Sequence, residues 1–202
     1  MPSKKLPIQK IVTSSLLYAL VFAGAGFGIE GHDNDKRCGG EELWNLKVLT
    51  DNASSEIKDN HRVTSIKKIA EIITDTAKRR KGGRLSFEKE IVTIKNVFIT
   101  KVILENDNDY HLVLKDSEGC TMIGEIVDPN CDDAQQAKDY IDDYENVRDM
   151  MDNLGNTYLN YKYEIKGVLF KDRAHGQTGR AANNLEIHPI LKLKPTKKLT
   201  FN

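Results

Sequence analysis

Hydrophobic and polar positions alternate along much of the second half of the chain, a pattern typical of strands that bury one face. These runs are rich in Val, Ile and Thr, and turn sequences such as NDND and SEG separate the first three. The pattern predicts five strands, in EIVTIKNVFITKVILEN (90–106), YHLVLKD (110–116), CTMIGEIV (120–127), YLNYKYEIKGVLFKD (158–172) and NLEIHPILKLK (184–194).

A helical period separates the third predicted strand from the fourth. In 131–155, one stripe of apolar residues recurs at helical spacing: Ala137, Tyr140, Ile141, Tyr144, Val147, Met151 and Leu154. Three strands, a helix and two strands is the element order of an OB-fold, a five-stranded Greek-key barrel. We therefore predict a β-rich α+β protein with an OB-like barrel (β-β-β-α-β-β). Another small α+β fold is the alternative, because element order alone does not fix topology.

Ahead of the barrel, the pattern predicts a strand and a helix. The run LWNLKVLTD (43–51) alternates and predicts a short strand, with Trp44 and Leu46 as anchors. The run VTSIKKIAEIITDTAKRR (63–80) has apolar residues at helical spacing, from Ile66 to Ala77. The basic run KRRKGGR (78–84) then predicts either a phosphate-binding patch or a solvated linker, and we favour the linker. This divides the chain into an extension (43–86), the OB-like domain (87–195) and a tail (196–202).

The N-terminus has the pattern of a secretory signal peptide. Three lysines precede an uncharged, mostly apolar stretch that ends in small residues at Ala23-Gly24-Ala25. We predict a signal peptide at 1–25, cleavage after Ala25 and a flexible lead-in at 26–42. An uncleaved anchor helix is the alternative. Cleavage would leave no membrane span and place the protein in the periplasm or outside the cell.

Export would permit a disulfide among the three cysteines, Cys38, Cys120 and Cys131. Cys120 and Cys131 flank the third predicted strand, whose eight residues span about 26 Å. A disulfide needs Cα atoms within roughly 7 Å. We therefore predict that Cys38 pairs with Cys131 or with Cys120.

Charge gives the protein as a whole no preference for a polyanion. Lysine plus arginine and aspartate plus glutamate both number 30, so there is no net attraction to nucleic acid or to anionic membranes. The predicted helix at 131–155 is strongly acidic, and its face would repel DNA. A solvated acidic face is the favoured interpretation of that element.

Two blocks of the chain resemble a known family. The segments DNDYHLVLKDSEGCTMIGEIVDPNC (107–131) and GVLFKDRAHGQTGRAANNLEIHPIL (167–191) are similar to a family of exported bacterial proteins. That family's pattern runs D-x-D-x-H-L-V-L, then T-M-I-x-E-I-P-D-P-x-C, then H-G-x-T-G-x-A-x-N-x-I-E-L-H-P-V-L. Val127 stands where the pattern has proline, and Cys120 is not part of it. The resemblance implies export and a compact β-rich domain, and it implies no reaction.

Two histidines and a carboxylate are candidates for chemistry. Strand alternation directs His111 and His188 away from the barrel interior. In an OB-like barrel, their strands flank the strand that carries Glu125. These three residues could form a metal site or an acid/base pair, or each histidine could simply hydrogen-bond a neighbour. A divalent metal is thus an option, although no cofactor is required.

The loop between the last two predicted strands is the candidate ligand loop. It is basic and glycine-containing, and the corresponding OB-fold loop commonly binds oligonucleotides or oligosaccharides. Its candidate binding residues are Lys171, Arg173, His175, Gly176, Gly179 and Arg180. The glycines would let backbone N–H groups form an anion nest.

These features favour a binding module over an enzyme. No established catalytic motif occurs in the sequence. We expect an exported OB-like domain that binds an unidentified ligand, an oligonucleotide or a glycan, through the 171–180 loop and the His111/His188 surface. A metal-dependent hydrolase that uses His111, Glu125 and His188 is the first alternative. A structural or partner-binding envelope protein is the second.

Overall fold

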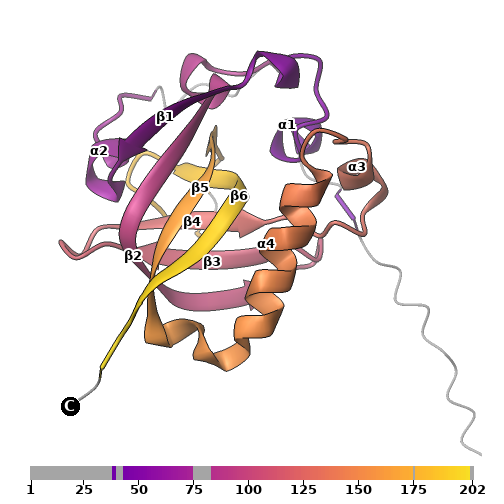
Figure 1. Cartoon of the computed structure of the whole chain (residues 1–202). Coiled ribbons are helices and arrows are strands. Elements are labelled where there is room, and N and C mark those ends of the chain that lie inside the picture. Colours follow the sequence, from indigo (N-terminus) through magenta and orange to yellow (C-terminus); the bar gives the residue numbers. More distant parts are fainter. Residues whose placement is uncertain (1–37, 40–42, 75–82, 175, 201–202) are drawn as a thin grey trace, which may run out of the picture. The chain divides into compact units, whose positions relative to one another are not determined.

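The computed structural model describes residues 38–39, 43–74, 83–174 and 176–200 (Figure 1). The predicted signal peptide, most of the lead-in and His175 lie outside these residues. Among the helices described, none is both long enough and apolar enough to cross a membrane.

Five strands form a closed barrel, and a sixth strand lies on its outside (Figure 1). The sheet order is β1-β2-β3-β4-β6-β5, and a further pairing of β2 with β5 closes the barrel. Within the barrel, β4 and β6 are parallel and the other pairs are antiparallel. The predicted OB-like architecture is confirmed. The strands are β1 (Lys58–Thr64), β2 (Glu90–Leu104), β3 (Tyr110–Lys115), β4 (Thr121–Ile126), β5 (Tyr161–Lys171) and β6 (Leu185–Lys198).

The helices are short, except for the one between β4 and β5. Four α-helices are described: α1 (Trp44–Lys47), α2 (Ile66–Ala70), α3 (Asp132–Gln135) and α4 (Ile141–Leu154). Single 3-10 turns lie at Ser54–Glu56, Ser86–Lys89 and Gly155–Asn160. The helix predicted over 131–155 is therefore two helices. A turn that includes the Tyr140 N–H to Ala137 C=O hydrogen bond separates them.

The extension ahead of the barrel differs most from prediction. The strand predicted over 43–51 is wrong, because Trp44–Lys47 form a helical turn that buries Trp44, Leu46 and Lys47 together. The helix predicted from residue 63 begins at Ile66, is capped by Ser65 and ends at Ala70. Ile73, expected on its apolar face, is 96% exposed. Strand β1 was not predicted, because its side chains are nearly all exposed and show no apolar alternation.

The alternation predicted for the last strand is interrupted in its middle. Leu185, Ile187, Ile190 and Leu193 all join the core inside the barrel, whereas Leu191 joins the packing on the outer face. The register between β5 and β6 shifts twice near this point, between Gly167 and Leu169 and between Lys166 and Gly167. Each irregularity places an extra residue in β6, so the faces reverse after Ile187 and return by Leu193. Strand β6 then continues to Lys198, into the segment expected to be a tail.

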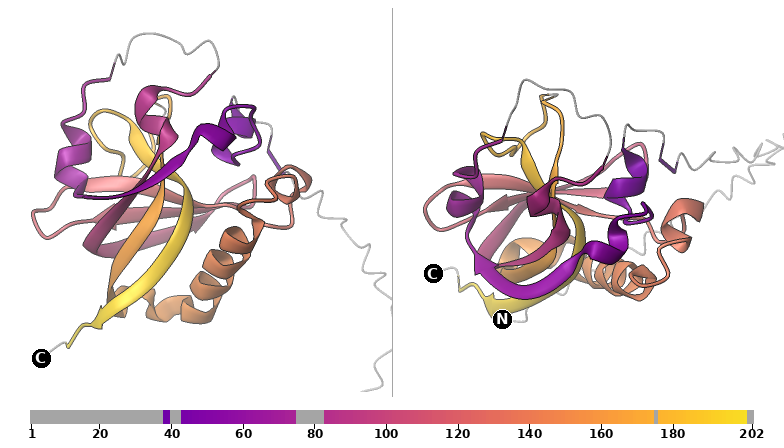
Figure 2. Two further views of the ribbon diagram at one scale, coloured as in Figure 1. Left: turned by 45° about the horizontal axis from the view of Figure 1, so that its top comes forward. Right: turned by 90° about the horizontal axis from the view of Figure 1, so that it is seen from above.

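Two hydrophobic cores lie on opposite sides of the sheet. The first fills the barrel and receives Val147 and Met151 from α4. The second lies on the outer sheet face, where Trp44 from α1 and Tyr144 from α4 meet Val168 and Leu191. The disulfide Cys38–Cys131, with Cα atoms 5.4 Å apart, borders this second core, so the structure selects Cys131 as the partner of Cys38. Figure 2 shows α1, α2 and the β5–β6 loop gathered at one end of the barrel.

Candidate functional site

A row of polar side chains crosses β3, β4 and β6 on the outer face of the barrel. His111 pairs directly with Glu125 across β3 and β4. Gly124 aligns with Ile187, so Glu125 shares its face with Glu186 and His188 on β6. Every member of this row is buried. The row lies on the sheet face predicted from the sequence, but other segments of the chain cover it.

His111 lies between two carboxylates and a backbone carbonyl. Its Nδ1 atom is 2.9 Å from Glu125 Oε1 and 3.3 Å from Glu105 Oε1. Its Nε2 atom is 3.2 Å from the carbonyl oxygen of Thr178. Because a carbonyl oxygen only accepts hydrogen bonds, Nε2 is the nitrogen that carries hydrogen. Burial lowers the pKa of His111, but Glu105 and Glu125 outweigh it and raise that pKa to about 10.

Of the two carboxylates beside His111, Glu125 is buried and Glu105 is partly exposed. Burial raises its pKa well above the ordinary value, and the contact with His111 opposes that rise. Glu186 on β6 contributes further to the rise, which shows that the two carboxylates interact. Oε2 of Glu125 has no hydrogen-bond partner among the described residues. The cluster thus contains a buried carboxylate oxygen that the described chain does not satisfy.

His188 has different surroundings. Its Nδ1 atom is 3.2 Å from Glu186 Oε1, and its Nε2 atom is 3.6 Å from Asp109 Oδ2. The rings of Trp44 and Phe170 pack edge-on to the imidazole, with centroids 6.5 and 6.0 Å away. Burial, aided by the positive charge of Lys47, lowers the pKa of His188 to about 3. The imidazole is therefore neutral at physiological pH.

Asp109 faces His188 from the loop between β2 and β3. Its Oδ1 atom accepts a hydrogen bond from the Asp128 N–H at 2.8 Å. Burial raises the pKa of Asp109 well above its ordinary value. Burial therefore disfavours the charged form of Asp109 and of the imidazole of His188 that it faces.

Helix α1 covers His188, and the disulfide belongs to the same outer hydrophobic core as Trp44. Trp44 lies against the imidazole, and Lys47 Nζ lies 3.9 Å from Asp172 of the β5–β6 loop. Hydrogen bonds from Tyr144 to the carbonyl of Val48, and from Arg84 to the carbonyl of Leu46, hold the helical turn in place. This use of Arg84 corrects part of the basic-loop interpretation of 78–84, since that guanidinium is buried. Residues 78–82 of the run lie outside the described chain.

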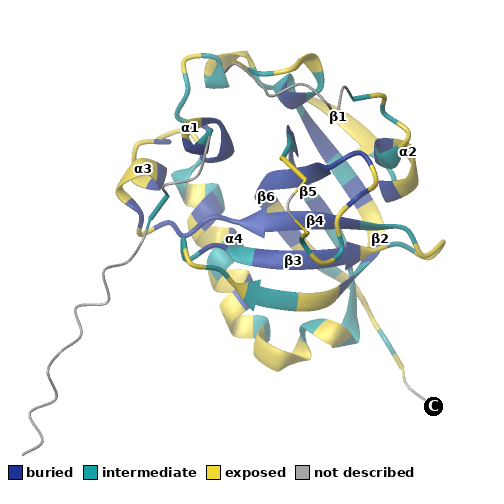
Figure 3. Cartoon of the chain, turned by 180° about the vertical axis from the view of Figure 1, so that it is seen from behind, coloured by how far each residue is buried: buried dark blue, intermediate teal, exposed yellow. Residues whose placement is uncertain are grey.

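The β5–β6 loop, which lies in front of β3 and β4 in Figure 3, covers His111 instead. Thr178 contacts the imidazole, and Gly179 packs against Val113. At Gly179, φ is +84°, and a Cβ atom would lie 2.5 Å from Val113 Cγ1. Backbone conformation and close packing therefore account for this glycine without any bound anion.

Of the other predicted loop residues that the structure describes, Lys171 is half-buried and the rest are exposed. The Lys171 backbone N–H donates to the buried carboxylate of Glu88 at 2.9 Å. Arg173, Gly176 and Arg180 are exposed, and Arg180 donates to Asn184 Oδ1. The side chain of Asn183 ties the loop to the carbonyls of Ile69 and Ile72. The loop is thus anchored on α2 and β3, with arginines on its outer side.

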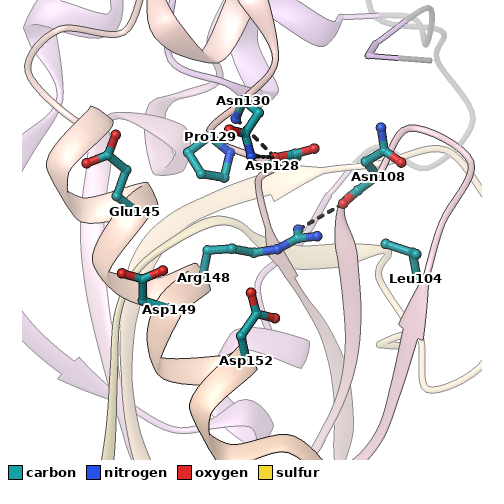
Figure 4. A pocket seen from close by; sticks show the side chains of 9 residues that line it. All are labelled: Leu104, Asn108, Asp128, Pro129, Asn130, Glu145, Arg148, Asp149 and Asp152. Atoms are coloured by element: carbon teal, nitrogen blue, oxygen red, sulfur yellow. Dashed lines mark hydrogen bonds between the residues drawn. The ribbon is translucent and has the colours of Figure 1, made fainter. Parts of the chain in front are cut away.

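A separate surface pocket of about 470 Å³ lies between the β2–β3 loop and α4 (Figure 4). Four carboxylates and Arg148 line it. The guanidinium of Arg148 lies 3.6 Å from the centre of the Tyr110 ring and donates to the carbonyl of Asn108. Neither predicted histidine lines this pocket.

The structure therefore divides the three predicted metal ligands between two clusters. His111 and Glu125 are in contact, whereas His188 pairs with Glu186 and Asp109. Sequence reasoning missed Glu105, Asp109 and Lys47. For Glu105 and Asp109, the sequence offered a signal, because both residues flank the turn that leads directly into the strand of His111. For Lys47, which is distant in sequence, it offered none.

Comparisons with known proteins add no name to this geometry. No family model, no curated protein and no solved structure matches the chain. The resemblance to an exported bacterial family stays a prediction, and the OB-like assignment rests on the strand topology.

Proposed function

We propose that this chain is a binding domain that holds an anionic oligomer on the β3–β4 face, between the β2–β3 and β5–β6 loops. The position of the polar row carries the proposal. OB-folds bind oligonucleotides and oligosaccharides on the corresponding strands and loops. The row lies on that face, and both loops contribute to it, through Glu105 and Asp109 on one side and Thr178 on the other.

Exposed cations lie on this face and on the loop that covers it. Lys101 pairs with Val113 across β2 and β3, and Lys115 lies two residues further along β3, so both share the outer face. Both side chains are exposed, as are Arg173 and Arg180 on the β5–β6 loop, which packs on Val113 through Gly179. These cations support an anionic ligand, because phosphate and carboxylate groups bind such cations through charge-assisted hydrogen bonds.

The acidic helix does not face this surface. Helix α4 lies in front of the barrel in Figure 1, and the β5–β6 loop lies in front of it in Figure 3, which shows the opposite side. Most of α4, whose charge argued against a polyanion partner at the level of sequence, therefore lies across the barrel from that loop, and Glu145, Asp149 and Asp152 line the pocket beside the β2–β3 loop.

Fluorescence anisotropy with two labelled probes, a single-stranded oligothymidylate and an oligouronate, tests this proposal. We expect at least one probe to bind with an affinity that falls as salt is added. Arg173→Ala and Arg180→Ala should each weaken that binding roughly five- to tenfold. Lys197→Ala is the matched control, because Lys197 is exposed at the opposite end of β6. Failure of both probes at low salt, or equal losses in the control, would contradict the proposal.

A further inference from the structure

We infer that Glu105, His111 and Glu125 form a binding site for a divalent transition metal ion, with Zn²⁺ as the cation to test first. Each residue offers one ligand atom, and these atoms all lie within 4.8 Å of one another. The three residues come from the β2–β3 loop, β3 and β4, and meet on the proposed ligand face. An imidazole with carboxylates suits zinc or manganese better than magnesium or calcium.

Two of the three spacings between the ligand atoms fit a single ion, and the third is at most 4.8 Å. With metal–ligand bonds of 2.0 to 2.2 Å, neighbouring ligands around a tetrahedral or octahedral ion lie roughly 2.9 to 3.5 Å apart. The distances from His111 Nδ1 to Glu125 Oε1 and Glu105 Oε1, 2.9 and 3.3 Å, lie within that interval. Although His111 Nδ1 is this close to carboxylates, it makes no well-aligned hydrogen bond within the described chain.

The carbonyl of Thr178 prepares His111 as a ligand. Since this carbonyl accepts from Nε2–H, a neutral imidazole presents the lone pair of Nδ1 to the two carboxylates. Metal-binding histidines commonly donate their other ring N–H to a backbone carbonyl in this way. Without a metal ion, a proton on Nδ1 lies between this nitrogen and the two carboxylate oxygens, and a bound cation would replace that proton.

Glu125 supplies an independent observation. Its side chain is nearly fully buried, and its Oε2 atom lacks a hydrogen-bond partner among the described residues. An unsatisfied buried carboxylate oxygen costs free energy, and a coordinated cation would offset that cost.

The site has an open side. The Glu105 side chain is 35% exposed, whereas those of His111 and Glu125 are 1% and 5% exposed. Three protein ligands leave at least one coordination position, as in metal sites that bind an exogenous group. Resting on the proposed function, we assign that position to an anionic group of the oligomer. A metal ion at this position would explain why Glu105 and Glu125 lie on a face that also carries exposed lysines.

Equilibrium dialysis of the untagged full chain, stripped with a chelator, tests the site with Zn²⁺ alone. We expect one bound Zn²⁺ and at least a tenfold loss of affinity in Glu125→Gln and in Glu105→Gln. Glu105→Gln keeps the test decisive if Glu125→Gln fails to fold, because Glu105 is partly exposed. Glu118→Gln, at a more exposed carboxylate on another turn, is the matched control and should bind as the wild type does. Absence of Zn²⁺ binding, or affinity unchanged in Glu105→Gln, would overturn the site.

Repeating the anisotropy measurements with and without Zn²⁺ tests the role of the ion. A probe that binds at least tenfold more tightly with Zn²⁺, and loses this gain in Glu105→Gln, supports coordination of the ligand. If the affinity for the probe is the same with and without Zn²⁺, the ion does not coordinate the ligand, but the metal site itself is not contradicted. Bound Zn²⁺ with no probe binding at all overturns the proposed function alone, so the two failures are distinguishable.

Discussion

The two buried histidines occupy the same outer sheet face and have opposite electrostatic surroundings. His111 lies between Glu105 and Glu125, and its pKa is raised to about 10. His188 lies against Trp44 and Phe170, near the charge of Lys47, and its pKa is lowered to about 3. The exposed fractions of the two residues are nearly equal, 1% for His111 and 2% for His188. The neighbouring groups therefore decide which imidazole favours a positive charge.

The two histidines are also covered by different kinds of structure. A turn of helix tied down by a disulfide covers His188, whereas a loop anchored through Gly179 and Asn183 covers His111. The first arrangement resembles a core, with apolar rings and neutralised polar groups. The second leaves the carboxylate of Glu105 partly exposed, and the covering loop carries the exposed Arg173 and Arg180. On the basis of this contrast, we propose ligand chemistry at His111 and a structural role at His188.

Removing the aromatic cover of His188 should have the largest effect. Trp44 is 7% exposed and contacts that imidazole, so Trp44→Ala should lower the free energy of unfolding by about 3–5 kcal/mol. Urea denaturation followed by circular dichroism measures this loss, since the substitution removes the sole tryptophan. Trp44→Phe is the control and should lose less. A loss below about 1 kcal/mol in Trp44→Ala would contradict the structural role of this region.

Altering the cover of His111 should have a smaller effect. Gly179→Ala places a Cβ against Val113 at a positive φ, and we expect a loss of about 2 kcal/mol. Gly176→Ala is matched in backbone, with φ +73°, but its Cβ would meet nothing within 4 Å. It should lose about 1 kcal/mol. Equal losses in thermal or urea denaturation would show that the loop does not pack on β3 as described.

The two histidines should also give opposite pH dependences of stability in the metal-free protein, each spread over several pH units. The raised pKa of His111 gives stability that is present below about pH 6.5 and is lost as pH rises towards 10. The lowered pKa of His188 gives stability that is present above about pH 6.5 and is lost as pH falls towards 3. Each slope is at most about 1.4 kcal/mol per pH unit.

Single substitutions separate these two contributions. His111→Gln should flatten the alkaline side of the stability profile, and His188→Gln should flatten the acidic side. Denaturant titrations at pH 5, 7 and 9 measure both slopes. If His188→Gln changed the alkaline side instead, the assignment of charge states to the two histidines would be wrong.

The barrel could be predicted from the sequence because its strands obey a period of two. Leu112 and Leu114 face the interior as expected, and the long β2 reaches both β3 and β5. Local patterns failed where tertiary packing decides the structure. The run at Trp44 alternates as a strand would, yet a helical turn there buries Trp44 and Leu46. Strand β1 has no buried face to leave a pattern.

The candidate site was predictable in part for the same reason. Alternation placed His111 and His188 on the outer face, and the strand order of an OB-fold placed the strand of Glu125 between them, without fixing the face of Glu125. The structure shows all three residues on one sheet face. It could not show what covers that face, because the covering segments come from residues 43–49 and 172–184, far away in sequence. The burial of both histidines and the participation of Glu105 depend on those long-range contacts.

The disulfide has a consequence for the order in which the chain can be assembled. Cys38 and Cys131 lie on either side of β1 to β4, and both precede β5 and β6 in the sequence. The bond can therefore form before either of the last two strands has been synthesised. In that order, the β5–β6 hairpin is the last part of the barrel to fold. It places His188 against the segment around α1 after the disulfide has already joined Cys38 to Cys131. A nascent chain truncated after α4 should then already carry the cross-link.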